Sequence, residues 1–237
     1  MKSDFFYLQH CRLRQTTSSH KIGTDAVILG AFTEHNNPLR ILDVGTGTGI
    51  IALMMAQKYP AASIDALDIS EHAYSEASEN FSNSPWSSQL TCHLKDAHNF
   101  CLQTSNSYDI IISNPPFFHN SLLSNNSEKN NARHTHSLSP ETLIDAAAVC
   151  ISQKGIFTVI IPYSDMHRYC IYAQSYHFFL IHSFVISPFA ESEPNRIVLI
   201  FSPTFKAFSK ENLFIYNNDT TYSEKYKVLT KSFLTHF

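Results

Sequence analysis

The stretch Arg40-Ile-Leu-Asp-Val-Gly-Thr-Gly-Thr-Gly49 decides the fold of this chain. Its first five residues, Arg40 to Val44, are typical of a strand. Three glycines at alternate positions follow, and glycine lets a backbone turn sharply and approach a ligand closely. The run Gly49 to Gln57 then predicts a helix. A strand, a glycine turn and a helix in this order indicate an α/β fold with a ligand site at the turn.

Strands and helices alternate along the chain beyond this turn. We expect strands at 62–68, 90–95, 108–113 and 155–161, and helices at 71–81 and 139–151. This alternation predicts a mostly parallel sheet that helices cover on both faces. Two further strand-like runs, 178–187 and 197–202, are separated by a segment too short for a long helix. They predict a hairpin whose antiparallel strand closes one edge of the sheet.

Length and composition fit one α/β domain spanning residues 1–237. Apolar residues make up 43% of the chain, but no apolar run reaches the ~20 residues of a membrane span. The first residues carry an early acid and no small-residue cleavage pattern, so we expect no secretory signal. The five cysteines are scattered, which indicates reduced thiols in a cytoplasmic protein with neither a metal site nor a disulfide frame.

The domain divides by sequence character into an N-terminal arm (1–38), a core (39–203) and a C-terminal strand and helix extension (204–237). Net charge is −3, which argues against a nucleic-acid partner. The ends differ from the middle, however, because residues 1–40 and 203–237 each hold five Lys or Arg against three acids. Electrostatic attraction to RNA is therefore expected to be local. In the arm, Thr24 or Asp25 is expected to cap a helix over 26–32.

The glycine turn carries the features of a cofactor site. Asp43 precedes Gly45 by two residues, and the glycines Gly45, Gly47 and Gly49 follow a G-x-G-x-G spacing. A carboxylate at Asp43 suits the cationic amino end of a methionine moiety better than a pyrophosphate, which it would repel. The alternative is a tight strand–helix turn with no ligand.

Two more acids follow the next strands. Asp68 ends its strand about twenty residues beyond the turn, where an acid commonly takes ribose hydroxyls. Asp96 ends the following strand and is a candidate acceptor for an adenine amino group, with a helix N-cap role as the alternative. Asp65 points to the opposite face of the sheet from Asp68, so we expect it to be structural or exposed.

The turn Asn114-Pro115-Pro116-Phe117 follows the strand at 108–113 and indicates the reaction. The Asn114 side-chain oxygen and the Pro115 carbonyl are two acceptors suited to one planar amino group, on a base or on a glutamine. The prolines fix the turn and remove competing amide donors, and Phe117 can stack on a base. With the cofactor motif, the turn predicts an S-adenosylmethionine-dependent N-methyltransferase. The chemistry of this turn leaves base and glutamine both open.

With these residues in hand, the chain resembles the bacterial methyltransferases that modify valine tRNA at N6 of the adenosine just 3′ of the anticodon. The resemblance runs over nearly the whole length. It rests on segments in every part of the chain: Lys21-Ile-Gly-Thr-Asp25, Ile41 to Gly49, Asn80 with Ser84-Pro85-Trp86, Ser113 to Phe117, Ala132-Arg133, Ser202-Pro203, Tyr222 to Tyr226 and Leu229 to Phe233. Two departures are His20, where methionine is frequent, and Phe117, where tyrosine is frequent.

The resemblance implies the Rossmann-like class I methyltransferase fold, a seven-stranded mostly parallel sheet with an antiparallel C-terminal hairpin strand. It also implies that Lys21, Gly23 and Thr24 fold over the methyl donor, S-adenosylmethionine, and that tRNA is the partner. No membrane and no obligate protein partner are implied. Candidate RNA contacts are Arg12, Arg14, Phe118, Arg133, Lys225 and Lys227.

Two rival hypotheses remain. A methyltransferase acting on protein glutamine or on a guanine amino group would use the same Asn-Pro-Pro-aromatic turn. The N-terminal 38 residues are too few for the helical substrate domain expected of a glutamine enzyme. A non-catalytic module that binds the donor or RNA is the other rival, and an intact Asn114 argues against it.

Overall fold

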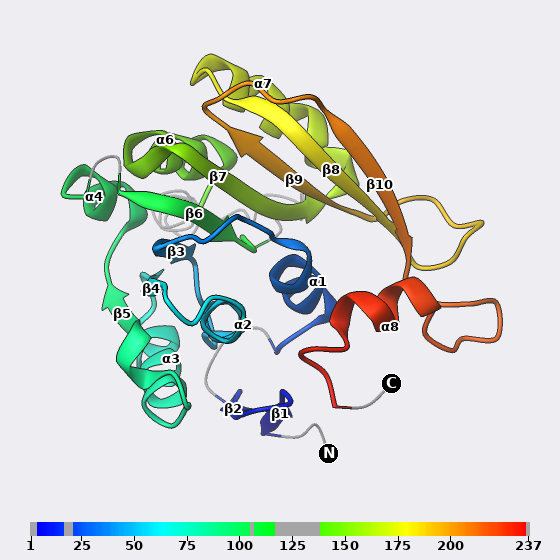
Figure 1. Cartoon of the computed structure of the whole chain (residues 1–237), viewed down its shortest axis with the longest axis horizontal. Helices are drawn as coiled ribbons and strands as arrows, with labels where there is room; N and C mark the ends of the chain where they lie inside the picture. Colours follow the sequence, from blue (N-terminus) through cyan, green and yellow to red (C-terminus); the bar gives the residue numbers. More distant parts are fainter. Residues whose placement is uncertain (1–3, 17–20, 105–106, 117–137, 236–237) are drawn as a thin grey trace, which may run out of the picture.

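A central parallel sheet organises the chain, and the computed structural model describes it through residues 4–16, 21–104, 107–116 and 138–235 (Figure 1). The described residues form eight strands of this sheet in the order β10–β8–β9–β7–β6–β3–β4–β5. Their bounds are β3 (Arg40–Val44), β4 (Ser63–Asp68), β5 (Leu90–Leu94), β6 (Tyr108–Ser113), β7 (Ile151–Pro162), β8 (Phe179–Ser187), β9 (Arg196–Ser202) and β10 (Ser209–Phe214).

Every neighbouring pair in this sheet is parallel except the two pairs that β9 makes with β7 and β8. The predicted hairpin is therefore confirmed as β8 and β9. Its antiparallel strand does not close the edge, because β9 lies inside the sheet and β10 pairs outside β8. The sheet accordingly has eight strands where seven were expected. The eighth strand, β10, buries only Leu213 fully, so its sequence has no clear strand pattern.

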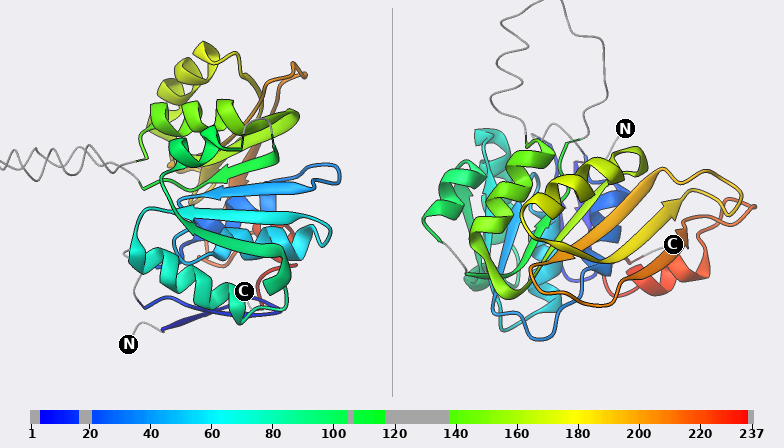
Figure 2. Two further views of the ribbon diagram at one scale, coloured as in Figure 1. Left: turned by 90° about the vertical axis from the view of Figure 1, so that its left-hand side faces the viewer. Right: turned by 90° about the horizontal axis from the view of Figure 1, so that it is seen from above.

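Helices cover both faces of the sheet, as Figure 2 shows edge-on. One layer holds α1 (Thr24–Phe32), α2 (Ile50–Lys58), α3 (Glu71–Ser82) and α8 (Glu224–Thr230). The other holds α4 (Ala97–Leu102), α6 (Pro140–Cys150) and α7 (Met166–Ser175). Each layer packs on its own set of alternate strand residues, so the chain has two apolar cores with the sheet between them. Short 3₁₀ turns lie at Ser87–Gln89 and Tyr163–Asp165.

The expected arm forms a separate antiparallel hairpin of β1 (Phe5–Tyr7) and β2 (Arg12–Arg14). Figure 1 shows this hairpin below α2 and beside α3, at the edge of the molecule. It also meets the other end of the chain, since Leu8 bridges to Leu234 and the Gln9 amide donates to the Phe233 carbonyl at 2.8 Å. The first helix differs from expectation at its start. Gly23 occupies the N-cap and has no side chain to form a cap bond, while Thr24 and Asp25 lie in the first turn of the helix, where the Asp25 carboxylate accepts a hydrogen bond from Arg196 at 2.8 Å.

The chain carries no helix in its described part that is long and apolar enough to cross a membrane. All five cysteines are free thiols, in line with the sequence. Two of them, Cys101 and Cys150, are neighbours between α4 and α6, with 2.7 Å between their sulfur atoms.

Candidate functional site

The glycine turn lies where the carboxyl ends of β3 and β4 meet. Gly45, Gly47 and Gly49 all have positive φ angles, of 75°, 57° and 83°, which L side chains rarely adopt. The amides of Gly45 and Thr46 both donate to the Leu67 carbonyl at 2.9 Å. These bonds fasten the turn to the adjacent strand.

Space around the three glycines differs. A Cβ atom at Gly45 would lie 2.9 Å from Leu138, and one at Gly49 would lie 2.4 Å from the Phe81 ring. A Cβ atom at Gly47 would meet nothing within 4 Å. Gly45 and Gly49 are therefore required for packing as well as for backbone conformation. Gly47 is the point at which the turn faces open space, where a ligand can approach the backbone.

Asp43 is fully buried behind this turn. Its Oδ2 accepts the Thr46 hydroxyl at 2.7 Å, and its Oδ1 has no hydrogen-bond partner among the described residues. Burial raises the pKa of the Asp43 carboxyl to about 7. The bond from Thr46 opposes this rise, and the negative charge of Asp68 adds to it. An unpartnered carboxylate oxygen in a buried position is an acceptor prepared for a cationic ligand group. A methionine ammonium meets that description.

Asp68 stands at the end of β4, on the other side of the turn. Its Oδ2 accepts the Gly47 amide at 3.0 Å and its Oδ1 accepts the Ser70 amide at 2.9 Å. A carboxylate has about four lone-pair sites, so two remain for ribose hydroxyls. Asp96 caps α4 by accepting the Asn99 amide at 3.1 Å, which confirms the N-cap alternative. Its exposed carboxylate also leaves lone pairs for an adenine amino group.

Asp65 has the structural role expected of it. It accepts the Tyr108 hydroxyl at 2.8 Å and lies 2.7 Å from His93 Nε2 and 3.3 Å from Arg40. These partners stand on the strands either side of β4 and on β6. The cluster therefore joins β3, β4, β5 and β6 on the face of the sheet opposite to α2, the helix that follows the glycine turn.

Asn114 follows β6 directly and lies beside the turn. The β3–β6 register pairs Val44 with Ser113, and the Ser113 hydroxyl donates to the Val44 carbonyl at 2.7 Å. Gly45 follows Val44, and Asn114 follows Ser113. Asn114 therefore lies at the end of β6, the strand next to the one that leads into the glycine turn. Asn114 is partly exposed, and its side chain makes no hydrogen bond to the residues that the structure describes. Pro115 is buried and Pro116 is exposed.

The N-terminal arm is tied to the same turn by two side chains of α3. Asn80 is buried; its Oδ1 accepts the Arg14 amide at 2.7 Å, and its Nδ2 donates to the carbonyls of Arg14 and Thr48 at 3.0 and 2.8 Å. One helical turn earlier, the buried Glu76 accepts the Thr16 amide at 2.6 Å. Asn80 thus joins the arm, α3 and the glycine turn. No sequence pattern assigns this role to Asn80 or Glu76, apart from the family resemblance that includes Asn80.

Most of the predicted site residues therefore lie together at the carboxyl ends of the parallel strands. The structure brings together Asp43, the three glycines, Asp68 and Asn114, with Asp96 at the end of the next strand. Lys21, Gly23 and Thr24 lead into α1, and Gly23 and Lys21 are exposed. Phe117, Phe118 and Arg133 lie outside the described residues.

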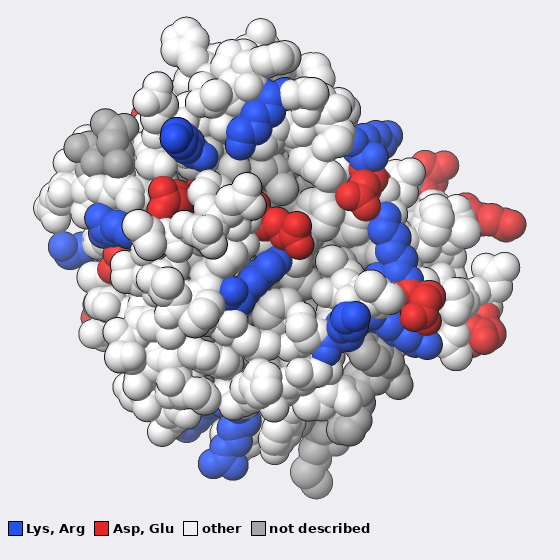
Figure 3. All heavy atoms as spheres, in the orientation of Figure 1, with Lys and Arg blue, Asp and Glu red and all other residues white. Residues whose placement is uncertain are grey.

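The candidate RNA contacts are scattered. The Arg12 guanidinium lies 5.0 Å from the Phe5 ring centroid, and Arg14 pairs with Glu79 at 2.8 Å, both in or beside the arm. Lys227 is on α8. Lys225 is on the same helix but pairs with Glu211 at 2.9 Å and lies at the opposite edge of the sheet from Asn114. Figure 3 shows one face of the molecule, on which basic and acidic side chains are interspersed and more of the acidic ones lie toward its right.

Comparison with known proteins gives consistent results. Residues 18–164 match the family model described as methyltransferase small domain. The chain is 38% identical over 229 residues to the tRNA1(Val) (adenine(37)-N6)-methyltransferase of Flavobacterium psychrophilum, covering 96% of this chain and 98% of that one. It is 34% identical to the protein of the same name from Bacteroides thetaiotaomicron, covering 100% and 99%. The crystal structure of a predicted O-methyltransferase from Agrobacterium tumefaciens superposes with a TM-score of 0.70 at 15% identity, covering 88% and 96%. This last likeness supports the fold alone.

The raised pKa of Asp43 predicts a pH-dependent stability. The folded state keeps the proton up to about pH 7, whereas the unfolded chain releases it near pH 4. Stability from this group is therefore full below about pH 4 and falls as pH rises to about 7. We expect Asp43→Asn to flatten the dependence of unfolding free energy on pH over this range, measured by urea denaturation. Glu193→Gln, at an exposed carboxylate, is the matched control; if it flattens the curve equally, the assignment to Asp43 is wrong.

The bonds of Asn80 predict a loosened arm when they are removed. Asn80→Ala leaves the Arg14 amide and two carbonyls without partners, so we expect a loss of about 1–3 kcal/mol of stability. We also expect trypsin to cleave after Arg12 or Arg14 faster than in the unchanged protein. Asn83→Ala is the matched control, since Asn83 is the exposed C-cap of the same helix and its side chain bonds, among the described residues, only to the Glu79 carbonyl. Equal cleavage rates in the two variants would contradict the role of Asn80.

Proposed function

Because the chain belongs to the methyltransferase small domain family, and within it to the tRNA1(Val) (adenine(37)-N6)-methyltransferases, we propose that it methylates N6 of an adenosine in the anticodon loop of valine tRNA, just 3′ of the anticodon. The observation that carries this proposal is the unpartnered side-chain amide of Asn114, one strand away from the glycine turn. S-adenosylmethionine is the proposed donor. When bound, it supplies an electrophilic methyl group.

The residues of the turn fit that donor. Asp43 Oδ1, buried and without a partner, would hold the methionine ammonium. The open space at Gly47 admits a ligand against the backbone, and Asp68 would accept ribose hydroxyls. Asp96 would accept the adenine amino group. Lys21, Gly23 and Thr24 would cover the donor from the start of α1, which the bonds of Asn80 to Arg14 help to place.

Asn114 would activate the target amine. The lone pair of an exocyclic amine is delocalised into its ring, so the amine is a poor nucleophile. The Asn114 oxygen and the Pro115 carbonyl would each accept one hydrogen from it, drawing the nitrogen toward a tetrahedral geometry and localising that lone pair. Alignment with the methyl group and this electrostatic support supply the catalysis. No strong base is required, because the proton leaves after transfer. Phe117 would stack on the base.

A tRNA substrate fits a cytoplasmic enzyme. The proposed RNA contacts are Arg12, Arg14, Phe118, Arg133, Lys225 and Lys227. Two of them, Arg14 and Lys225, also form ion pairs within the protein, with Glu79 and Glu211. The acidic side chains in Figure 3 fit a local basic surface better than attraction by the whole protein.

The function is tested with labelled S-adenosylmethionine and total tRNA from a strain that lacks this modification. Mass spectrometry of the nucleosides should find N6-methyladenosine, in valine tRNA. Methyl groups on protein glutamine or on guanine would favour the rival enzyme, and no transfer with intact donor binding would favour the non-catalytic module.

Asn114 provides the sharpest single-residue test. We expect Asn114→Ala to slow transfer by at least about 10²-fold while the dissociation constant for S-adenosylmethionine changes little. Asn114→Asp keeps an acceptor oxygen in the same place and should be faster than the alanine variant. The measurements are single-turnover transfer to tRNA and calorimetric binding of the donor. An alanine variant as active as the unchanged protein would refute the acceptor mechanism.

A further inference from the structure

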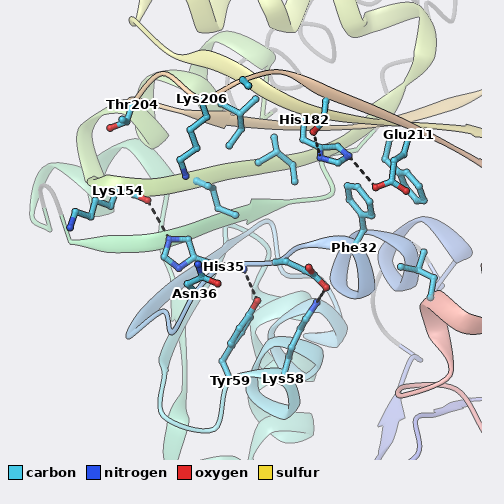
Figure 4. Close-up of a pocket in the computed structure, with 18 of the residues that line it drawn as sticks. Phe32, His35, Asn36, Lys58, Tyr59, Lys154, His182, Thr204, Lys206 and Glu211 are labelled. Carbon is cyan, nitrogen blue, oxygen red and sulfur yellow. Dashed lines mark hydrogen bonds and ion pairs between the residues drawn. The ribbon is translucent and has the colours of Figure 1, made fainter.

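A large cavity lies away from the glycine turn. Its volume is about 1010 Å³, at the upper limit of the range for small-molecule sites. His35 and Asn36 line it just before β3, Lys58 just before β4, and His182 near the start of β8. These four residues lie at or near the amino ends of strands that run in the same direction. The cavity therefore opens at the opposite edge of the sheet from Asn114, and no part of the proposed methyl transfer uses it (Figure 4).

Four lysines and two carboxylates line this cavity, which gives it an excess of two positive charges with neutral histidines. Two of the lysines are already engaged. Lys58 Nζ donates to the carbonyls of Ala31 and Thr33 at 2.9 and 2.8 Å, and Lys225 Nζ pairs with Glu211 at 2.9 Å. That leaves two lysines to meet a ligand.

These two lysines, Lys154 and Lys206, form no hydrogen bond or ion pair through their ammonium groups with the described residues. They come from β7 and from the segment between β9 and β10. Figure 4 shows both on the same side of the cavity as His35, whereas Glu211 stands on the other side. The unpaired positive charge is therefore gathered at one end.

Histidine nitrogens add to this polar lining. His35 Nε2 lies 3.3 Å from the Lys154 carbonyl, while its Nδ1 is buried without a hydrogen-bond partner. His182 Nδ1 bonds to the Ser209 hydroxyl at 2.8 Å, and burial lowers the pKa of His182 from its ordinary value. The two histidines therefore give the cavity a polar wall beside the lysines.

The floor of the cavity is apolar. It includes Ile156, Phe184 and Ile200, all buried, and Phe32, whose ring stacks on Phe184 at 3.9 Å between centroids. An apolar and aromatic floor suits the flat, uncharged part of a ligand. The cationic end suits a phosphate or a carboxylate. The two parts together define a ligand with a ring at one end and a negative charge at the other.

We propose that this cavity binds a small organic anion of nucleotide size, with a planar ring on the apolar floor and a phosphate or carboxylate at Lys154 and Lys206. An RNA strand fits the lining less well. Glu34 and Glu211 stand at the same cavity, and a continuous polyanion would meet both carboxylates. A compact anion meets only the end where the lysines are unpaired. The inference does not depend on the proposed function, because it rests on residues at the amino ends of the strands, away from the glycine turn and Asn114.

The test uses the full chain saturated with S-adenosylhomocysteine, so that the donor site cannot take up the probe. A fluorescent N-methylanthraniloyl derivative of guanosine monophosphate is titrated, and anisotropy gives the dissociation constant. We expect saturable binding that the double variant Lys154→Gln with Lys206→Gln weakens by about tenfold or more, roughly the loss of one charge-assisted bond. Lys210→Gln, an exposed lysine of β10 that does not line the cavity, should leave binding unchanged.

Transfer to tRNA is measured on the same double variant. Unchanged transfer with weakened probe binding supports a separate small-anion site. Absence of saturable binding below about 1 mM, or binding that the double variant does not weaken, overturns the proposal. A loss of tRNA binding as large as the loss of probe binding would also overturn it, because the cavity would then be a contact for RNA. Both substituted lysines are exposed, so the variant is expected to fold.

Discussion

The buried carboxylate of Asp43 is the constraint on which the carboxyl edge of the sheet depends. It is fully buried, the Thr46 hydroxyl and the Ala52 backbone act to lower its pKa, and its Oδ1 has no close hydrogen-bond partner among the described residues. An unpaired charge in that position is unfavourable, which the rise of its pKa to about 7 expresses. The glycine turn folds directly over it with three positive φ angles, and two of those glycines have no room for a side chain. The cationic methionine end of the proposed donor would pair with this carboxylate at the turn.

Much of the fold could be predicted from the sequence because the motifs and the apolar runs agree. The strand at β6 was predicted with its observed bounds, and the hairpin of β8 and β9 was recognised from the short segment between them. The errors have physical causes. Strand β10 exposes five of its six residues, so no pattern marks it as a strand, and its pairing with β8 depends on tertiary structure. The cap of α1 was misassigned because Gly23 occupies the N-cap, while Asp25 lies in the first turn and is bound by Arg196, a partner 171 residues away.

In the site as well, positions that follow from local sequence could be predicted, whereas contacts between segments far apart in the sequence could not. Asp43, Asp68 and Asn114 each follow or end a strand, so their common edge follows from a parallel sheet alone. The role of Asn80 does not, since its three bonds exist only when the arm lies against α3. Lys225 shows the limit of reading charge from the sequence. It stays a candidate for an RNA contact, but the sequence does not show that the return of α8 to β10 pairs it with Glu211. The sequence alone does not show on which face of the folded protein a charged side chain will lie.

The arrangement of acids at the carboxyl edge also bears on the chemistry. Asp43 is the carboxyl group in the described part of the chain whose pKa is clearly raised, and a raised pKa often marks a general base. Its hydroxyl partner, however, is Thr46 within the cofactor turn, and its side chain lies behind the backbone of that turn. Asn114, one strand away, has no titratable proton at all. In the proposed mechanism, the group with the raised pKa binds the donor, and Asn114 acts on the target amine through its hydrogen bonds rather than by taking up a proton. A reaction that needs alignment and lone-pair localisation, and releases its proton afterwards, is the one that this division of roles supports.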